Sequence, residues 1–392
     1  MRPLDGITVI TLEHAVAAPF ATRQLADLGA RVIKIERPGS GDFARAYDDR
    51  VDGMASYFVW INRSKESITL DLKHPEAGKV LKQLLSKADV LVQNLAPGAA
   101  ARMGLSAAAL RPQHPELIVC DISGYGQDGP YRDKKAYDIL IQAEAGLLSV
   151  TGTPDDPSRA GVSAADISAG MYAYGSILAA LLQRGRTGKG SHIDVSMLEA
   201  LGEWMGNPLY YAYKGNGPPP RAASSHPSIY PYGPFKTGDG KAVLLGVQNE
   251  REWVLFCQEV LRQPEIATDA RFDSNVARNK NRVALRDVIE AVFAGLSAAQ
   301  VTERLERATI GNARMNDMHD VWAHPQLKAR DRWREVQSPV GAIPALLPPG
   351  INDSFDYRMD PVPALGAHTD AILHELGYAS NDIQRLREAG VV

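Results

Sequence analysis

Short apolar runs alternate with helical patterns through the first third of the chain. Residues 19–29 and 74–88 carry apolar side chains at helical spacing. The runs with the length and composition of buried strands are 7–12, 31–36, 67–72, 89–94 and 117–123. Strand and helix in alternation are typical of βαβ units. The pattern therefore predicts an α/β domain with a mostly parallel, doubly wound sheet.

A longer helix is predicted after Asp166. No charged residue occurs from Ile167 to Leu182, and the apolar positions cover more than one stripe, so we expect a helix buried nearly all round. Asp166 stands at its head, where its side chain can serve as the N-cap and the helix dipole can keep it ionised. Capping alone accounts for an aspartate here, so the pattern leaves open whether it does more.

The remaining segments predict a second, smaller domain. A strand at 192–196 and a helix to about Tyr213 precede GNGPPPR (215–221), which cannot continue a helix. A hairpin turning at Asp239-Gly240, then two or three helices up to Arg307, indicate an α+β unit. We expect helices at 367–378 and 381–389 to pack back on the first domain. The predicted boundaries are 1–213 (large domain), 214–225 (linker), 226–330 (small domain), 331–350 (return linker, with PALLPPG) and 351–392 (rest of the large domain).

Composition restricts the possible functions. A length of 392 residues suits two domains, and a net charge of -3 without a long basic run argues against nucleic-acid binding. Two distant cysteines, Cys120 and Cys257, fit a reducing cytoplasm. Asp5 and Glu13 interrupt the N-terminal apolar stretch, and no run of uncharged apolar residues in the sequence reaches about 18 residues. We therefore expect neither a signal peptide nor a membrane span.

Several familiar motifs are absent. The turn after the first strand, EHAVAAP, lacks the glycines of a dinucleotide site, and GRTGKGS (185–191) has two residues where a P-loop needs four. The nine histidines are scattered, so no metal is expected, and no G-x-S-x-G elbow presents a serine. A carboxylate remains the best candidate for covalent catalysis.

At the level of motifs the chain resembles the class III coenzyme A transferases. The matching stretches are LGARVIKIERPGSGD (28–42), NRSKESITLDLK (62–73), QNLAPG with RMGL (93–105), SGYGQDGP (123–130), KAYD (135–138), SVTG with GVSAADISAG (149–170), TGKGSHIDVSMLEA (187–200) and SHPSIYPYGPFKTGDG (225–240). The resemblance implies a Rossmann-like large domain and a small domain joined by two linkers. It also implies a homodimer in which two subunits interlock like links of a chain.

The resemblance further implies a mechanism and a set of site residues. The aspartate matching Asp166 attacks an acyl-CoA, forming first an aspartyl anhydride and then an aspartyl-CoA thioester. His14, Tyr137 and His226 are implied to bind the substrate, Tyr137 through its acyl group. The residues implied to contact coenzyme A are Val16, Ala17, Arg37, Leu70, Asp71, Leu72, Lys73, Asn94, Leu95, Ala96, Arg102, Lys135, Ala136, Tyr137 and Asp138.

Some of these residues have an alternative interpretation. Arg37 and Arg102 would, outside such motifs, be solvated surface side chains. Tyr137 could be a core aromatic residue that opens a helix at Asp138, although a tyrosine here suits acyl contact and is a poor base at neutral pH.

Two departures from the formyl-CoA branch bear on the acceptor. That branch has a glutamine where this chain has Val16, and its glycine-rich flap is absent after LLGV (244–247). We therefore expect an acceptor other than oxalate: a C4–C6 dicarboxylate such as succinate, itaconate, mesaconate, citramalate or a glutarate, with succinyl-CoA as donor. Two alternatives stay open, an α-methylacyl-CoA racemase and a non-catalytic CoA-binding dimer.

Overall fold

The computed structural model describes residues 1–392. The chain forms two compact units. Unit 1 comprises Met1–Leu147, Arg159–Asn207 and Ala329–Val392, and unit 2 comprises Leu148–Ser158 and Pro208–Lys328.

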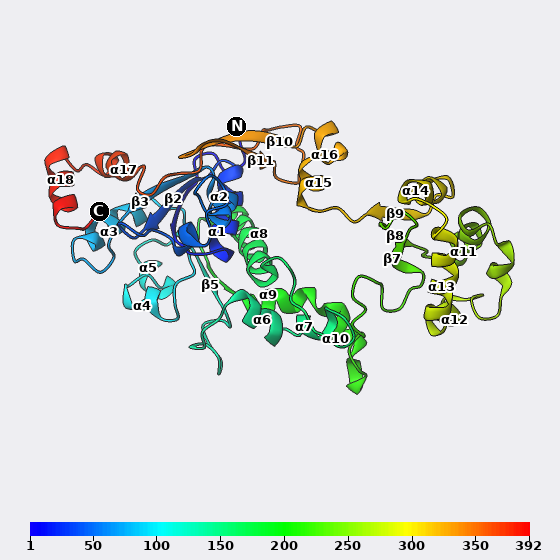
Figure 1. The fold of residues 1–392 in the computed structure, drawn as a ribbon. Coiled ribbons are helices and arrows are strands. Elements are labelled where there is room, and N and C mark those ends of the chain that lie inside the picture. Colours follow the sequence, from blue (N-terminus) through cyan, green and yellow to red (C-terminus); the bar gives the residue numbers. More distant parts are fainter. The chain divides into compact units, whose positions relative to one another are not determined.

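A six-stranded parallel sheet forms the centre of unit 1 (Figure 1). Its strands are β1 (Thr8–Leu12), β2 (Arg31–Glu36), β3 (Lys65–Thr69), β4 (Val90–Gln93), β5 (Ile118–Ser123) and β6 (His192–Ser196). The order β3-β2-β1-β4-β5-β6, with every pair parallel, is that of a Rossmann sheet. The predicted α/β fold class is confirmed.

Successive residues of the inner strands β1, β2, β4 and β5 serve two cores, one on each face of the sheet. Val9 and Val32 belong to the core that includes helices α1 and α8, whereas Ile10 and Ile33 belong to the core that includes α3, α17 and α18. Both faces of these inner strands are thus covered, which explains why they have apolar residues at most positions. The C-terminal helices do pack on this sheet, as predicted.

The helices of unit 1 surround the sheet (Figure 1). They are α1 (Ala17–Asp27), the 3-10 helix η1 (Phe43–Ala46), α2 (Ser56–Asn62), α3 (Ala77–Leu85), α4 (Ala99–Arg102), α5 (Ala107–Leu110), α6 (Asp138–Glu144), α8 (Ala164–Thr187), α9 (Met197–Trp204), α17 (Thr369–Glu375) and α18 (Ser380–Glu388).

Helix α8 packs closely against α1. A Cβ on Gly170 would lie 2.7 Å from the carbonyl oxygen of Ala17, so only glycine allows this approach. The expectation that α8 is buried nearly all round is wrong, because Met171 and Leu182 are 40% and 62% exposed. Of all the helices, only α8 is long and apolar enough to cross a membrane, and here it contributes eight buried residues to the packing of unit 1.

Unit 2 is built on an antiparallel sheet of β7 (Tyr232–Lys236), β8 (Ala242–Gly246) and β9 (Gly311–Arg314). The predicted turn at Asp239-Gly240 joins β7 to β8, with Gly240 at φ 77°. Aromatic side chains such as Phe235, Trp253 and Phe293 form its core. The helices are α11 (Glu250–Leu255), the π-helix η3 (Phe256–Leu261), the 3-10 helix η4 (Pro264–Thr268), α12 (Asn275–Lys280), α13 (Arg282–Phe293), α14 (Ala298–Arg307) and α15 (Met318–Trp322).

Short helices occur where the chain runs from one unit into the other: α7 (Leu147–Val150), α10 (Gly206–Tyr211) and α16 (Pro325–Ala329). The 3-10 helix η2 (Tyr213–Gly215) follows α10 within unit 2.

The segment expected as a return linker, 331–350, contains a hairpin. Strands β10 (Trp333–Ser338) and β11 (Gly341–Leu346) pair with each other alone, so Pro344 lies in a two-stranded sheet that tolerates it. Val336 and Ile343 are buried with Phe58 in a small core of unit 1. These strands were not predicted because the proline-rich composition of the segment is typical of a linker.

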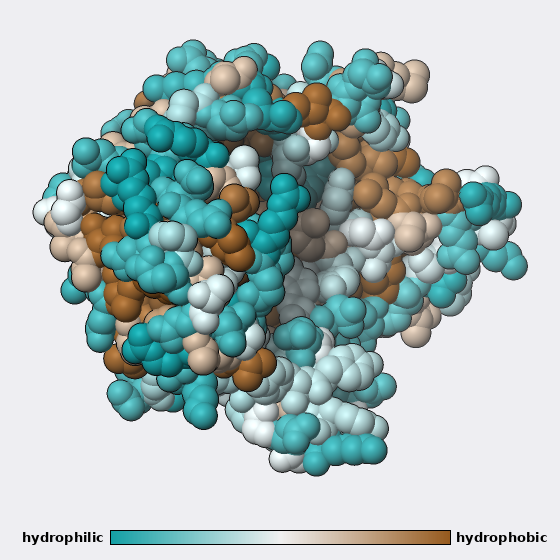
Figure 2. Space-filling model, turned by 90° about the vertical axis from the view of Figure 1, so that its right-hand side faces the viewer, coloured by the Kyte–Doolittle hydropathy of each residue, from teal (hydrophilic) through white to brown (hydrophobic).

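Large hydrophobic side chains also remain exposed. On the face shown in Figure 2, brown hydrophobic groups gather in several patches between hydrophilic residues. In unit 1 the exposed aromatic residues include Tyr137, Tyr172 and Trp204.

Candidate active site

The residues that the motifs mark in unit 1 gather at one edge of the parallel sheet. His14 follows β1, Arg37 follows β2, and Leu70 follows β3 directly. Asn94 follows β4, and the loop after β5 leads to Tyr137. The carboxyl ends of parallel strands form the usual ligand edge of such a fold. The structure thus brings these segments together at the edge where a ligand is expected.

Asp166 occupies the first turn of α8, but it is not the N-cap. The N-cap position is Ser163, and the Asp138 carboxylate caps the helix instead. Its Oδ1 accepts hydrogen bonds from the backbone N–H groups of Ala165 (2.8 Å) and Asp166 (3.2 Å). The capping role predicted for Asp166 is therefore wrong, and its side chain makes no capping hydrogen bond.

The Asp166 carboxyl group is partly buried and no hydrogen bond or ion pair reaches it. Burial, and secondly the negative charge of Asp138, raise its pKa from 3.8 to about 7. The expectation that the helix dipole keeps it fully ionised is wrong, because the Asp138 carboxylate already occupies the N–H groups at this helix end. At neutral pH this carboxyl group divides between its two protonation states.

The KAYD segment is held against the sheet and against α8. A Cβ on Gly124 would lie 2.1 Å from that of Ala136, so glycine permits the loop to pack here. Asp138 Oδ2 accepts a hydrogen bond of 2.6 Å from the buried Gln142 amide. Tyr137 is 67% exposed, which excludes the core interpretation for it in this structure. Lys135, beside it, is exposed as well.

The loop after β1 is fixed from two sides. The Asn94 side chain accepts from the backbone N–H of His14 (2.9 Å) and donates to its carbonyl (2.8 Å). The imidazole of His14 stacks on Phe43, with ring centroids 5.1 Å apart. Val16 is buried in a small apolar cluster against which Ile167 packs. The loop therefore lies beside the start of α8 and Asp166.

A buried cluster of charges supports this loop. Glu13 accepts from Lys65 (2.6 Å) and Lys34 (3.3 Å), and Lys34 also donates to Asp42 (2.8 Å). Burial opposes the charge of Glu13, but the two lysines outweigh it and lower its pKa to about 2. The motifs did not mark this cluster, although a lysine between two isoleucines in a buried strand, as Lys34 is, was a usable signal.

Tyr47 is a second residue that the motifs did not single out. Its ring is 5.9 Å from that of Phe43 and stands edge-on to Tyr57. Burial, followed by the charges of Asp42 and Asp166, raises its pKa to about 12. A neutral phenol thus lies within electrostatic reach of Asp166.

The two arginines expected to bind phosphates are exposed and make no ion pair. Arg37 follows β2, and Arg102 ends α4 with its guanidinium over Gly98. Leu70 is buried, and the backbone N–H of Asp71 donates to the carbonyl of Val391 (2.8 Å). Leu72, Lys73, Leu95 and Ala96 are at least partly accessible, and Ala17 is buried at the start of α1.

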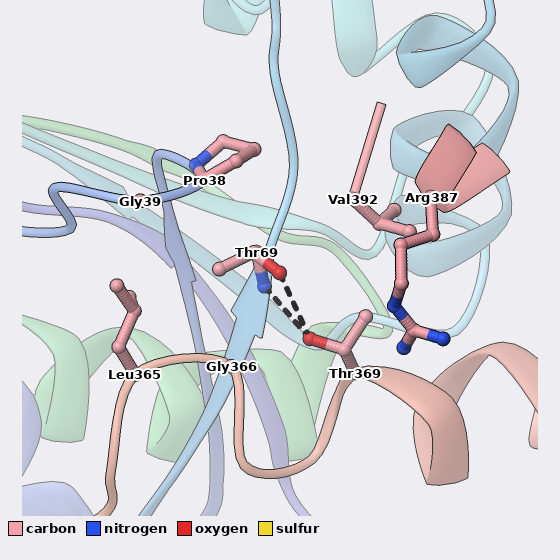
Figure 3. A pocket seen from close by; sticks show the side chains of 8 residues that line it. All are labelled: Pro38, Gly39, Thr69, Leu365, Gly366, Thr369, Arg387 and Val392. Atoms are coloured by element: carbon pink, nitrogen blue, oxygen red, sulfur yellow. Dashed lines mark hydrogen bonds between the residues drawn. The ribbon is translucent and has the colours of Figure 1, made fainter. Parts of the chain in front are cut away.

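A cavity of about 330 Å³ adjoins Arg37 and Leu70 at this edge. Figure 3 shows its lining residues Thr69 and Thr369 hydrogen-bonded to each other, with hydroxyl oxygens 3.1 Å apart. Its lining residues are Pro38, Gly39, Thr69, Leu365, Gly366, Thr369, Arg387 and Val392.

His226 lies in unit 2. Its imidazole stacks on Tyr232 at 5.3 Å, and its Nδ1 accepts from the backbone N–H groups of Ser228 and Ile229. These bonds fix Nδ1 as an acceptor within a local turn.

Comparison with known proteins identifies the class. The family model described as CoA-transferase family III matches residues 4–369. Succinyl-CoA:glutarate CoA-transferase of Mus musculus is 36% identical over 398 residues, covering 100% of this chain and 91% of that protein. Acetyl-CoA:oxalate CoA-transferase of Acetobacter aceti is 37% identical over 331 residues, covering 84% and 85%.

A solved structure gives the same result. The crystal structure of a CAIB/BAIF family protein from Brucella suis superposes with a TM-score of 0.86 at 34% identity, covering 96% of this chain and 99% of that one. The protein is a CoA-transferase, with CoA thioesters as its substrates. The chain belongs to CoA-transferase family III, as its motifs predicted.

Proposed function

We propose that this enzyme transfers CoA from succinyl-CoA to a C4–C6 dicarboxylate, with Asp166 as the nucleophile. The observation that carries the proposal is the Asp166 carboxyl group itself, which no hydrogen bond or ion pair engages. A partly buried carboxylate without partners is poorly solvated and therefore reactive.

The chemistry needs one carboxylate and no ATP. An Asp166 oxygen attacks the thioester carbonyl carbon, the C–S bond breaks, and the CoA thiolate leaves with the electron pair. The thiolate then attacks the aspartyl carbonyl of the anhydride and releases the donor acid. The acceptor carboxylate attacks the carbonyl carbon of the aspartyl-CoA thioester, which releases the CoA thiolate and leaves an anhydride between Asp166 and the acceptor. The thiolate then attacks the acceptor carbonyl of that anhydride. The acceptor leaves as its CoA thioester, and the Asp166 carboxylate is restored.

Coenzyme A would lie along the carboxyl edge of the sheet. Arg37 and Arg102 are exposed cations without ion-pair partners and would pair with its phosphates. The chain at 70–73, 94–96 and 135–138 would line the path, and Val16 and Ala17 would border its reactive end. Tyr137 and His14 would contact the acyl group or the arm that carries it, and His226 would contact the acceptor.

The identity of the acceptor acid is the more specific part of the proposal. The Mus musculus relative acts, by its name, on glutarate, and we take glutarate as the first candidate. The Acetobacter aceti relative names oxalate, which the sequence analysis set aside. Incubating the protein with succinyl-CoA and a panel containing both acids, then measuring new CoA esters by mass spectrometry, tests this. A glutaryl-CoA or other C4–C6 product supports it, whereas oxalyl-CoA alone contradicts it.

We further propose that the enzyme is an interlocked homodimer in the cytoplasm. Exposed Tyr172, Leu182 and Trp204 on helices of unit 1 favour burial against a second copy. Sedimentation at decreasing concentration should show a dimer that separates only on unfolding. A stable folded monomer would contradict the interlocked arrangement.

A further inference from the structure

The Asp42 carboxylate joins the loop after β1 to the next segment of the chain. It is completely buried, and its Oδ1 accepts from the backbone N–H groups of Ala15 (3.1 Å) and Ala44 (2.9 Å). Its Oδ2 accepts from Lys34 (2.8 Å). Ala15 has a positive φ of 59°, a strained conformation that this hydrogen bond helps to hold.

The same carboxylate faces the His14 ring. Asp42 Oδ1 lies 3.9 Å from His14 Nδ1, which is buried and has no hydrogen-bond partner. The remaining exposure of this side chain, 15%, therefore lies away from Nδ1. Stacking on Phe43 keeps the ring plane fixed.

The surroundings of His14 define its charge and its tautomer. Burial lowers the pKa of the imidazole, and Lys34 and Arg37 act in the same direction against the opposing effect of Asp42. In the neutral ring, one of the two nitrogens Nδ1 and Nε2 therefore carries the N–H and the other carries a free lone pair. A lone pair on Nδ1 would point toward a carboxylate oxygen and be repelled, whereas an N–H there is attracted.

We propose that Asp42 is a positioning residue that holds His14 as the Nδ1–H tautomer, so that Nε2 offers a hydrogen-bond acceptor to the bound acyl-CoA. An ionised dicarboxylate has no donor for such an atom. Near its sulfur, acyl-CoA has the amide N–H groups of its pantetheine arm. His14 therefore recognises the CoA arm and not the acceptor acid, an assignment that rests on the proposed binding of acyl-CoA at this edge.

Nitrogen NMR of the protein labelled with ¹⁵N-histidine tests the tautomer in the absence of any substrate. Comparison with His14→Gln assigns the signal among the nine histidines. We expect a protonated Nδ1 and an unprotonated Nε2 in the wild type, and a mixture of tautomers in Asp42→Asn. A protonated Nε2 in the wild type overturns the proposal.

Calorimetric titration with free CoA tests the consequence without turnover, so its outcome is separate from the identity of the acids. Losing one hydrogen bond should weaken CoA binding by about fivefold in Asp42→Asn and in His14→Phe, which keeps the ring stack. Asp27→Asn is the matched control, since Asp27 is equally buried and pairs with Arg23 and Arg63 at the other end of α1. It should leave CoA binding unchanged.

Equal weakening in Asp27→Asn would mean that general destabilisation explains the effect, and the proposal would fail. It would fail as well if His14→Phe bound CoA like the wild type. Should Asp42→Asn not fold, the wild-type tautomer and His14→Phe decide the question by themselves.

Discussion

Replacing Asp166 with asparagine should stabilise the folded protein, and the gain should grow as the pH rises. The native state holds this carboxyl group with a pKa of about 7, whereas an unfolded chain returns it to its usual 3.8. Between these values the unfolded state has lost the proton that the native state still binds, so stability falls with increasing pH. Above about pH 7 the full cost is present.

The difference between the two pKa values corresponds to about 4 kcal/mol. Solvent screening of the partly exposed carboxylate reduces it, so we expect about 2 to 4 kcal/mol at pH 8. More than half of this should develop between pH 5 and pH 8. An asparagine carries no charge, so Asp166→Asn should escape the penalty at every pH.

Thermal unfolding of both proteins at several pH values provides the assay. The melting temperature of Asp166→Asn relative to the wild type should rise by a few degrees from pH 5 to pH 8. Asp133→Asn is the control, because the Asp133 side chain is 78% exposed and its removal should produce no such trend. A difference independent of pH, or a less stable Asp166→Asn at pH 8, would refute the reasoning.

Two further predictions concern catalysis. The charge of Asp138 is the second cause of the raised pKa of Asp166, so Asp138→Asn should move the acidic limb of the kcat/KM profile to lower pH. The limb should not disappear, since the burial of Asp166 persists. An unmoved limb would show that the charge of Asp138 has no influence on Asp166. Incubation with a 2-methylacyl-CoA in deuterated water should leave the α-carbon unlabelled, since the exposed Tyr137 phenol is a poor base at neutral pH. Deuterium that enters the α-carbon as fast as CoA is transferred would favour a racemase.

The inner strands of the sheet could be predicted from the sequence because they are buried on both faces. Val9 and Ile10 serve opposite cores, so apolar residues occur in continuous runs that mark the strands clearly. Residues that directly follow those strands, such as His14 and Asn94, necessarily meet at one edge. That part of the candidate site follows from topology.

Other features depend on contacts distant in sequence. The cap of α8 comes from Asp138, the first residue of α6, which lies 27 positions before Ala165, and capping rules that consider only neighbouring residues assign it to Asp166. The charge cluster of Glu13 and Lys65 joins residues 52 positions apart, and neither residue type predicts burial. Exposure of Leu182 on α8 likewise follows from what packs around the helix and not from its own composition.

The central claim is that Asp166 forms a covalent bond to the substrate. Wild-type enzyme mixed with succinyl-CoA, quenched in acid and digested should yield a peptide containing Asp166 with the added mass of CoA. Asp166→Asn and Asp166→Ala should lack this adduct and lose transfer by several orders of magnitude while still binding CoA. Turnover near the wild-type rate in either variant, or a CoA adduct on another residue, would contradict the account.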